Sequence, residues 1–279
     1  TYSAPSTSLH RANSVTVTEN GDYIVGGLRG AGSLLLKFDM LGNVKWATWY
    51  YDSIRGQPIL HGSSNINCVQ ETTTGQIICA LGDRYADETG SDLSNYAAVL
   101  KFDSTGKLLR RLQWSNPTGY DIGGFYIEET STGCYLLSGN KALYYIDTSG
   151  GVVWQKEYTY MLEGVGSTVN TVNRAKMLRD GSLMVAGQSY ESNCWVKYNN
   201  LYYDAWWSSI SYAYGTDETW NTFGQQGGDD NIFDFTQLVD GNLVFVGRKS
   251  SVYEPGGVWA FVTDSRGDSV LWERRVNIP

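Results

Sequence analysis

Asp240-Gly241-Asn242-Leu243-Val244-Phe245-Val246-Gly247 reads as a tight turn followed by a short apolar strand that ends on glycine. The same pattern occurs five times in the 279 residues, with its turn glycines at positions 21, 75, 133, 181 and 241. The steps between these glycines are 54, 58, 48 and 60 residues. Strand-rich units that recur every 20–50 residues, or at slightly longer steps, are typical of repeat architectures. This segment therefore predicts a fold built from five similar units.

Each copy belongs to a unit that reads as four short strands joined by turns. An Asp-x-x-Gly turn precedes the last strand of four units, at residues 39–42, 103–106, 147–150 and 264–267. The fourth unit departs from this pattern, because residues 199–202 read Asn-Asn-Leu-Tyr. We place its third and fourth strands at residues 195–198 and 204–210. The five units cover about residues 10–51, 65–115, 123–159, 168–211 and 230–277.

A tryptophan follows the expected turn at a similar place in four units: Trp46, Trp154, Trp206 and Trp272. Four-stranded units repeated radially form a β-propeller, which leaves only short, protected sheet edges. We expect each indole to be buried between two packed units, which contributes roughly 2–3 kcal/mol. The sequence thus predicts an all-β fold, a five-bladed β-propeller of four-stranded antiparallel blades. We expect a single domain over residues 1–279.

Four phrases carry a resemblance to a known kind of protein. They are LLLKFDMLGNVKWATWY at 34–50, YYIDTSGGVVWQKEY at 144–158, VNRAKMLRDGSLMVAG at 172–187 and LVDGNLVFVGR at 238–248. These phrases resemble the tandem repeats of secreted bacterial and archaeal β-propellers, and the resemblance covers all five units. It implies extracellular or surface display and adhesion more often than catalysis. It carries no catalytic residue over to this chain.

Charge and composition exclude some partners. The chain has 21 Lys and Arg against 29 Asp and Glu, a net charge of −8, so we expect no nucleic-acid binding. It has no apolar run of 18 residues, so we expect no membrane insertion. The scattered Cys68, Cys79, Cys134 and Cys194 favour free thiols, with a Cys68–Cys79 bridge as the alternative.

Long connections are expected at one end of the units, where function usually lies. We place them at residues 52–64, 83–95, 115–124, 159–168, 208–231 and 248–257. The candidate ligand-binding residues there are His61, Tyr85, Tyr120, Tyr160, Glu163, Tyr190, Trp220, Arg248 and Tyr253. Tyrosine and tryptophan offer rigid contact area with a polar tip, which suits a glycan or a protein partner. The alternative is that the long loops only pack over the channel mouth.

Two acidic segments offer oxygen atoms that Ca²⁺ prefers as ligands. Their residues are Asp83, Asp87 and Asp92 in one segment and Asp229 and Asp230 in the other. Neither segment has the EF-hand spacing, and acidic loops are usually only solvated. We therefore favour no cofactor, with Ca²⁺ as the alternative.

The pattern favours a non-catalytic, extracellular or surface-displayed binding or structural module. Such a module is adhesin-like or is a subunit of a surface filament or virion assembly, and its partner is a protein, a glycan or another copy of itself. Because His10 and His61 are the only histidines, few residues could serve as the base of a Ser-His-Asp triad, and we expect the protein not to be an enzyme. One alternative is a carbohydrate-active enzyme, a glycoside hydrolase or lyase, using Asp121, Glu163 and Asp229. Another is a glycan-binding lectin, although the unequal loops argue against one pocket per blade.

Overall fold

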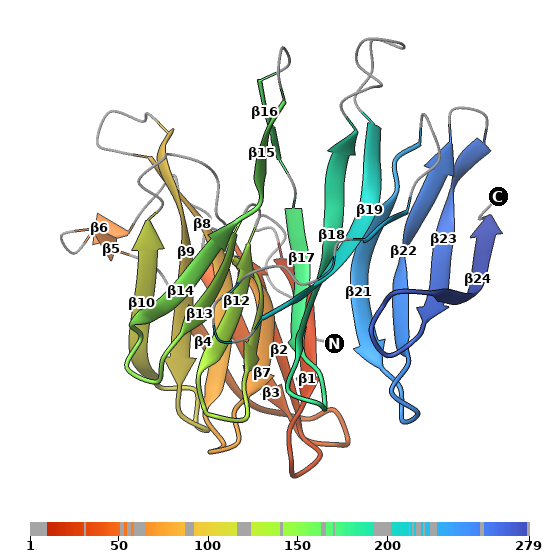
Figure 1. The fold of residues 1–279 in the computed structure, drawn as a ribbon. Coiled ribbons are helices and arrows are strands. Elements are labelled where there is room, and N and C mark those ends of the chain that lie inside the picture. The colour runs from red at the N-terminus through yellow and green to blue at the C-terminus, as the bar shows by residue number, and fades with distance from the viewer. Residues whose placement is uncertain are drawn as a thin grey trace. The chain divides into compact units, whose positions relative to one another are not determined.

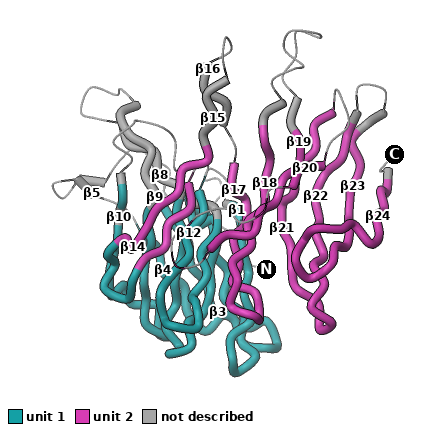
Figure 2. Tube along the Cα trace, in the orientation of Figure 1, with its two compact units in different colours: residues 1–139, 147–151 teal, residues 140–146, 152–279 magenta. Residues whose placement is uncertain are grey.

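The computed structural model of the chain consists of strands, turns and their connections (Figure 1). The structure describes residues 10–30, 32–50, 53–54, 57–58, 65–86, 92–115, 124–139, 142–162, 166–169, 171–191, 202–211, 213, 215, 219, 221–223, 228–251 and 254–277. Within those ranges, no helix is long and apolar enough to cross a membrane. The chain divides into two compact units, residues 1–139 with 147–151 and residues 140–146 with 152–279 (Figure 2).

The strands form five four-stranded antiparallel sheets, and each sheet follows the order of the chain. Sheet 1 contains β1 (His10–Val17), β2 (Tyr23–Arg29), β3 (Gly32–Phe38) and β4 (Val44–Tyr50). Sheet 2 contains β7 (Asn65–Glu71), β8 (Ile77–Ala86), β9 (Asp92–Phe102) and β10 (Leu108–Ser115). Sheet 3 contains β11 (Gly124–Glu129), β12 (Tyr135–Gly139), β13 (Ala142–Ile146) and β14 (Val152–Glu157).

Sheet 4 contains β17 (Thr171–Met177), β18 (Leu183–Glu191), β19 (Tyr202–Ile210) and β20 (Asn221–Phe223). Sheet 5 contains β21 (Asn231–Gln237), β22 (Leu243–Ser251), β23 (Glu254–Thr263) and β24 (Val270–Asn277). Two short hairpins pair β5 (Ser53–Ile54) with β6 (Gln57–Pro58) and β15 (Thr159–Leu162) with β16 (Gly166–Val169). In each sheet, the turns after the first and third strands share one end, here called the turn end. The opposite end, where the second strand connects to the third, is called the loop end.

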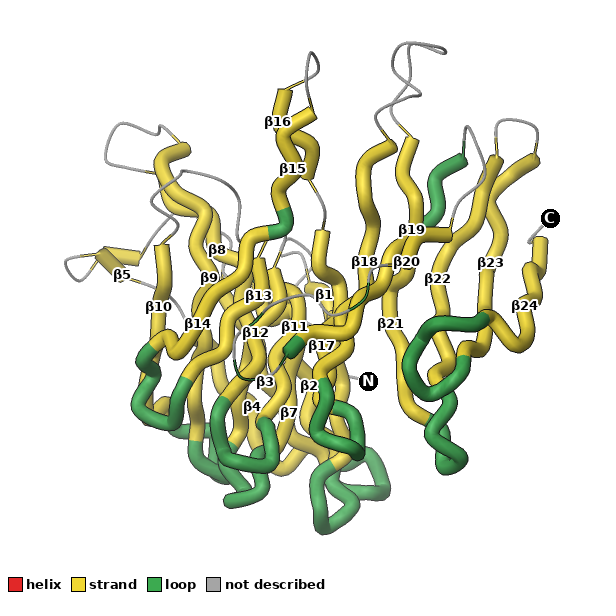
Figure 3. The backbone as a smooth tube through the Cα atoms, viewed as in Figure 1, coloured by secondary structure: helices red, strands yellow, loops and turns green. Residues whose placement is uncertain are grey.

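The Asp-x-x-Gly turns close on their own residues, which explains why they end the third strands so sharply (Figure 3). In sheet 2, the N–H of Gly106 donates to the carbonyl of Asp103 at 3.0 Å, and Gly106 has a φ of 83°, which glycine adopts without strain. The Asp103 carboxylate accepts from the hydroxyl of Thr105 at 2.6 Å and from the N–H of Lys107 at 3.0 Å. These hydrogen bonds, led by the one from Thr105, lower the pKa of Asp103.

Sheet 4 corrects the sequence prediction. Its β19 pairs with β18 from Leu183 opposite Ile210 to Glu191 opposite Tyr202, so residues 204–210 form a third strand and not a fourth. The fourth strand is the short β20, and the predicted third strand at 195–198 lies outside the described residues. Trp206 is consequently not at the position of the other tryptophans; it is fully buried on a third strand. Without an Asp-x-x-Gly turn, the apolar run before Ile210 suits a third or a fourth strand equally.

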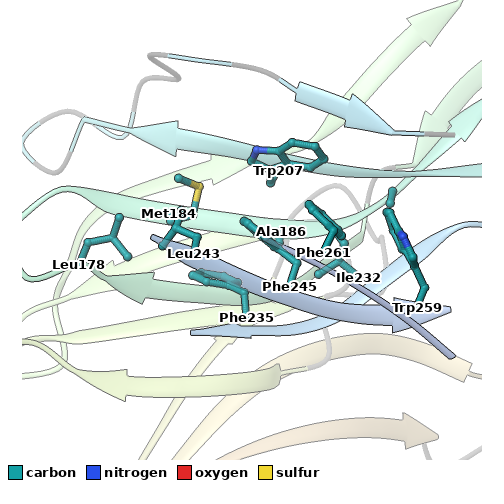
Figure 4. Close-up of a cluster of buried hydrophobic side chains, with 11 residues drawn as sticks. Leu178, Met184, Ala186, Trp207, Ile232, Phe235, Leu243, Phe245, Trp259 and Phe261 are labelled. Carbon is teal, nitrogen blue, oxygen red and sulfur yellow. The ribbon is translucent and has the colours of Figure 1, made fainter. Parts of the chain in front are cut away.

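An aromatic core lies between sheets 4 and 5 (Figure 4). The rings of Phe245 and Phe261 stack with centroids 4.7 Å apart, and Trp259 lies 4.4 Å from Phe261. From sheet 4, the Trp207 ring lies 5.2 Å from Phe261, and its indole N–H donates to the carbonyl of Gly267 at 2.8 Å. Large aromatic side chains dominate packing energy, so this cluster joins the two sheets firmly.

A recurring contact links consecutive sheets through the glycine that lies between the third and fourth strands. A β-carbon added to Gly106 would lie 2.9 Å from the Trp46 ring of the preceding sheet, and the Trp46 N–H donates to Ser104 O at 3.2 Å. A β-carbon added to Gly215 would likewise lie 2.8 Å from the Trp154 ring. Trp46 and Trp154 thus pack against the next sheet, but both are only partly buried, whereas the sequence analysis expected them to be buried. Trp272, in contrast, is 48% exposed.

The cysteines that the structure describes are thiols outside any disulfide. Cys68 and Cys79 are buried and Cys134 is partly buried, which confirms the preference for thiols over a Cys68–Cys79 bridge. The residues opposite Cys68 and Cys79 across the β7–β8 pair are Ala80 and Val69, so the two thiols do not face one another. Burial raises the pKa of the Cys79 thiol well above its usual value, which makes it a poor nucleophile.

Candidate functional site

Three of the predicted aromatic site residues lie on strands where loops were expected. Tyr85 of β8 stands opposite Ser94, Tyr160 of β15 opposite Thr168, and Tyr190 of β18 opposite Tyr203. Much of the expected loops at 83–95 and 159–168 is therefore hairpin, including Asp83 and Asp92, which belong to β8 and β9. The strands extend beyond their apolar residues because backbone hydrogen bonding between strands does not require apolar side chains. His61, Asp87, Tyr120, Asp121, Glu163, Trp220 and Tyr253 lie outside the described residues.

Arg248 is a predicted site residue whose side chain the structure describes, and it is exposed. It lies near the loop end of β22, opposite Asn231 of β21 on one side and Val258 of β23 on the other. A β-carbon added to Gly256 would lie 2.6 Å from the Arg248 Nε, so the absence of a side chain at Gly256 leaves room for the guanidinium. Arg248 makes no ion pair with any residue that the structure describes.

Asp229 and Asp230 have different roles beside Arg248. The N–H of Asp229 donates to the Ser250 hydroxyl at 2.9 Å, and that hydroxyl donates to the Asp229 carbonyl at 3.0 Å. The buried Asp230 carboxylate accepts from the Ser250 N–H at 3.0 Å and so fixes the end of β22. The Asp229 side chain remains exposed. In the described part of the chain, no three His, Cys, Asp or Glu side chains gather as a metal site would require.

A pair of carboxamides completes the cluster, and the sequence analysis missed it. Asn173, at the bulge of β17, donates to the Asn231 side-chain oxygen and to the Ile232 carbonyl, both at 2.7 Å. In sheet 1, Asn13 at the bulge of β1 likewise donates to the Ile66 carbonyl at 2.9 Å. A spacing signal was present, because Asn13, Asn67 and Asn173 each lie eight residues before a turn glycine.

The next residue of β22, Lys249, points to the opposite face of sheet 5, where it contacts Glu273 and Phe223. Its Nζ lies 2.7 Å from the Glu273 carboxylate and 4.3 Å from the centre of the Phe223 ring. The Trp259 N–H donates to the same Glu273 oxygen at 3.0 Å. Lys249 therefore belongs to the core between sheets 4 and 5, whereas Arg248 projects toward solvent.

The described residues thus form one polar cluster at the loop end of sheets 4 and 5, within one compact unit. It consists of Asn173, Asp229, Asn231, Arg248 and Ser250. Arginine supplies a rigid fork of donors, the carboxamides both donate and accept, and the Asp229 carboxylate accepts. This set suits a ligand rich in hydroxyl, amide or carboxylate groups.

Comparisons with known proteins bear on the fold. No protein-family model and no curated protein matches the chain. Among solved structures, a protein of unknown function from Bacteroides caccae is 14% identical with a TM-score of 0.57, over 96% of this chain and 82% of that one. The Dos1 propeller is 13% identical with a TM-score of 0.53, over 94% of this chain and 59% of its own.

An ancestral GH74 enzyme is also similar in fold, at 13% identity and a TM-score of 0.55, over 96% of this chain and 33% of that one. Likeness at such low identity concerns the backbone arrangement alone. Together with the five sheets, it defines the fold: the chain is a five-bladed β-propeller of four-stranded antiparallel blades. The predicted fold class is confirmed.

Proposed function

We propose that the protein is a non-catalytic binding or structural module, displayed outside the cell or on a virion surface. It holds a polar partner, a glycan or a protein segment, at the loop end of sheets 4 and 5. The observation that supports this proposal is Arg248, an exposed guanidinium beside Gly256 with no ion pair to any described residue. An arginine fork in this state can donate two parallel hydrogen bonds to a carboxylate or to paired oxygens.

The surroundings of Arg248 favour recognition over a purely structural role. Its cross-strand neighbour Asn231 is held by Asn173, and Asp229 is anchored through its backbone to Ser250. The polar groups are therefore fixed before any ligand arrives, which reduces the entropy lost on binding. Trp220 and Tyr253, predicted at this same end, would add apolar contact area for a sugar ring or a side chain.

The proposal is tested by screening wild type and an Arg248→Ala variant on a glycan array and against surface proteins of the source cells. We expect Arg248→Ala to weaken binding about tenfold or more, since hydrogen bonds to charged groups contribute roughly 1.5–3 kcal/mol. Arg266→Ala is the matched control, because Arg266 is an exposed arginine of the same sheet at its turn end.

Equal affinity of the Arg248→Ala and Arg266→Ala variants for the ligand would contradict the assigned site. Release of new reducing ends or unsaturated products from a bound polysaccharide would contradict the non-catalytic assignment. That result would favour a carbohydrate-active enzyme, and Asp229→Asn would then be the first variant to assay for lost cleavage.

A further inference from the structure

Sheet 4 extends beyond the aromatic core at its loop end. The pairing of β18 with β19 continues from Gln188 opposite Ala205 to Tyr190 opposite Tyr203. Successive residues of a strand alternate between its two faces, so both pairs belong to one face. Ala205 is part of the core that sheet 4 shares with sheet 5, and both sheets lie in one compact unit. The tyrosine pair therefore lies on the face of sheet 4 that is turned toward sheet 5.

Tyr190 and Tyr203 form an aromatic pair at the end of this face. Residues directly opposite one another in an antiparallel pair have β-carbons about 4.5–5.5 Å apart, so the register brings the two tyrosines together. Tyrosine combines a large, rigid apolar ring with a polar tip, and tyrosines are enriched where proteins bind partners. The pair is thus suited to contact a flat, partly apolar ligand.

Gln188, in the neighbouring pair of the same face, adds a hydrogen-bonding group. Its side chain is half-buried, and none of the residues that the structure describes forms a hydrogen bond with its carboxamide. A carboxamide both donates and accepts hydrogen bonds, and a polar group withdrawn from solvent usually has a partner. Gln188 is therefore available to bind a hydroxyl group of a ligand beside the tyrosine pair.

The charges around this face favour a neutral ligand. Lys249 lies on the face of sheet 5 that meets sheet 4, and its Nζ is 2.7 Å from the Glu273 carboxylate, which neutralises it. The acidic residues Glu191 and Asp204 are placed by the register on the other face of sheet 4. A sugar ring suits this arrangement, because its C–H groups can cover aromatic rings while its hydroxyl groups bond to a carboxamide.

We propose that Tyr190, Tyr203 and Gln188 form a binding subsite for a neutral sugar ring. The inference rests on the proposed function, because it names a neutral glycan as the partner bound at the loop end of sheets 4 and 5. It does not involve Arg248, which lies on the other face of sheet 5 from Lys249. The two assignments can therefore fail separately.

An array of neutral and uronic-acid oligosaccharides, followed by calorimetric titration with the neutral oligosaccharide that binds most tightly, tests the proposal. We expect Tyr190→Ala and Tyr203→Ala each to weaken the affinity about tenfold or more, because aromatic anchors carry much of a binding energy. Tyr190→Phe and Tyr203→Phe should retain most of the affinity, since the ring remains. Gln188→Ala should weaken it about threefold to tenfold, as expected for one lost hydrogen bond.

Tyr202→Ala is the matched control, because Tyr202 is a tyrosine at the same end of β19 that the register places on the other face. It should bind as the wild type does. A wild type that binds no oligosaccharide, or only uronic-acid ones, would overturn the proposal. So would wild-type affinity in both tyrosine-to-alanine variants, or an equal loss in Tyr202→Ala and Tyr203→Ala.

Circular dichroism melts separate binding from folding. A cross-strand aromatic pair also stabilises its hairpin, so the alanine variants should melt at a slightly lower temperature. A lower melting temperature with unchanged affinity would assign the pair a purely structural role and overturn the proposal. Gln188→Ala keeps both tyrosines and provides a second route if the tyrosine variants fail to fold; wild-type affinity in that variant would count against the subsite.

The same titrations on Arg248→Ala distinguish this inference from the proposed function. Weaker binding by Arg248→Ala together with wild-type affinity in the tyrosine variants would overturn the subsite and leave the proposed function standing. Weaker binding by the tyrosine variants alone would support the subsite and remove the role assigned to Arg248. Binding of a surface protein but of no glycan would overturn the subsite alone.

Discussion

The two faces of sheet 5 use the same strands but meet different surroundings. On the inner face, Phe245, Trp259 and Phe261 are fully buried against sheet 4. On the opposite face, Val258 and Trp272 are about half exposed. An antiparallel sheet that meets water on one side usually carries polar residues there. The opposite face is mixed, because the exposed Arg248 and Arg274 stand opposite Val258 and Ala260. The comparison teaches that only the face packed on sheet 4 is a continuous apolar surface.

The largest expected difference in stability is between substitutions of Trp207, which packs in the core between sheets 4 and 5, and of Trp272, which lies on the opposite face of sheet 5. Trp207→Ala should cost about 3–5 kcal/mol in the free energy of unfolding, because it leaves a cavity beside Phe261 and Phe245. Trp272→Ala should cost less than about 1 kcal/mol, because Trp272 is about half exposed. Urea unfolding followed by far-ultraviolet circular dichroism measures both. Equal costs would contradict the difference in burial between the two side chains.

A smaller difference in stability is expected between alanine substitutions of two turn glycines, one packed against a tryptophan and one not. Gly42 and Gly267 both have positive φ, so alanine strains the backbone by roughly 1–2 kcal/mol at either position. At Gly267 the new β-carbon would also lie 3.0 Å from the Trp207 Nε1, whereas no described atom is that near Gly42. Gly267→Ala should therefore destabilise the chain more than Gly42→Ala in the same urea experiment. A reversed order would contradict the packing inferred for Trp207.

Acid should have the smallest effect on stability, because it acts on exposed turn aspartates and not on the packed face of a sheet. The hydroxyl of Thr105 and nearby N–H groups hold the pKa of Asp103 below its ordinary value of 3.8. The resulting stability is fully present above that ordinary value and is lost as pH falls through the lower pKa of the folded state. Asp103→Asn should therefore melt less pH-dependently than wild type between about pH 4 and pH 2. An identical pH dependence would contradict this origin of acid sensitivity.

The sequence predicted most of the fold because turn chemistry is local. Sheets 1, 2, 3 and 5 begin and end close to the predicted unit boundaries. The turns at Gly42 and Gly150 demand a positive φ that glycine supplies most easily, so their residues identify them. Sheet 4 was misread because its third-to-fourth connection lacks that turn, and pairing between β18 and β19 depends on distant residues.

The candidate site was predicted less well, for two physical reasons. Arg248 was singled out from its place in a predicted connection, and the structure finds it exposed, although on a strand. Asn173 was overlooked because a carboxamide in isolation suits any turn or loop. Asn173 becomes a site candidate only through its hydrogen bonds to Asn231 and Ile232 of the next sheet. A local sequence pattern does not reveal such long-range hydrogen bonds.

The turns that close on their own aspartates have a consequence for how the chain acquires its structure. Each forms its hydrogen bonds among residues at most five positions apart, so closing it loses little chain entropy. Nucleation is thereby distributed along the polypeptide, as in other repeat architectures, and is not confined to one hairpin. We therefore expect the refolding rate to fall only modestly when any one of Asp39, Asp103 or Asp147 is replaced.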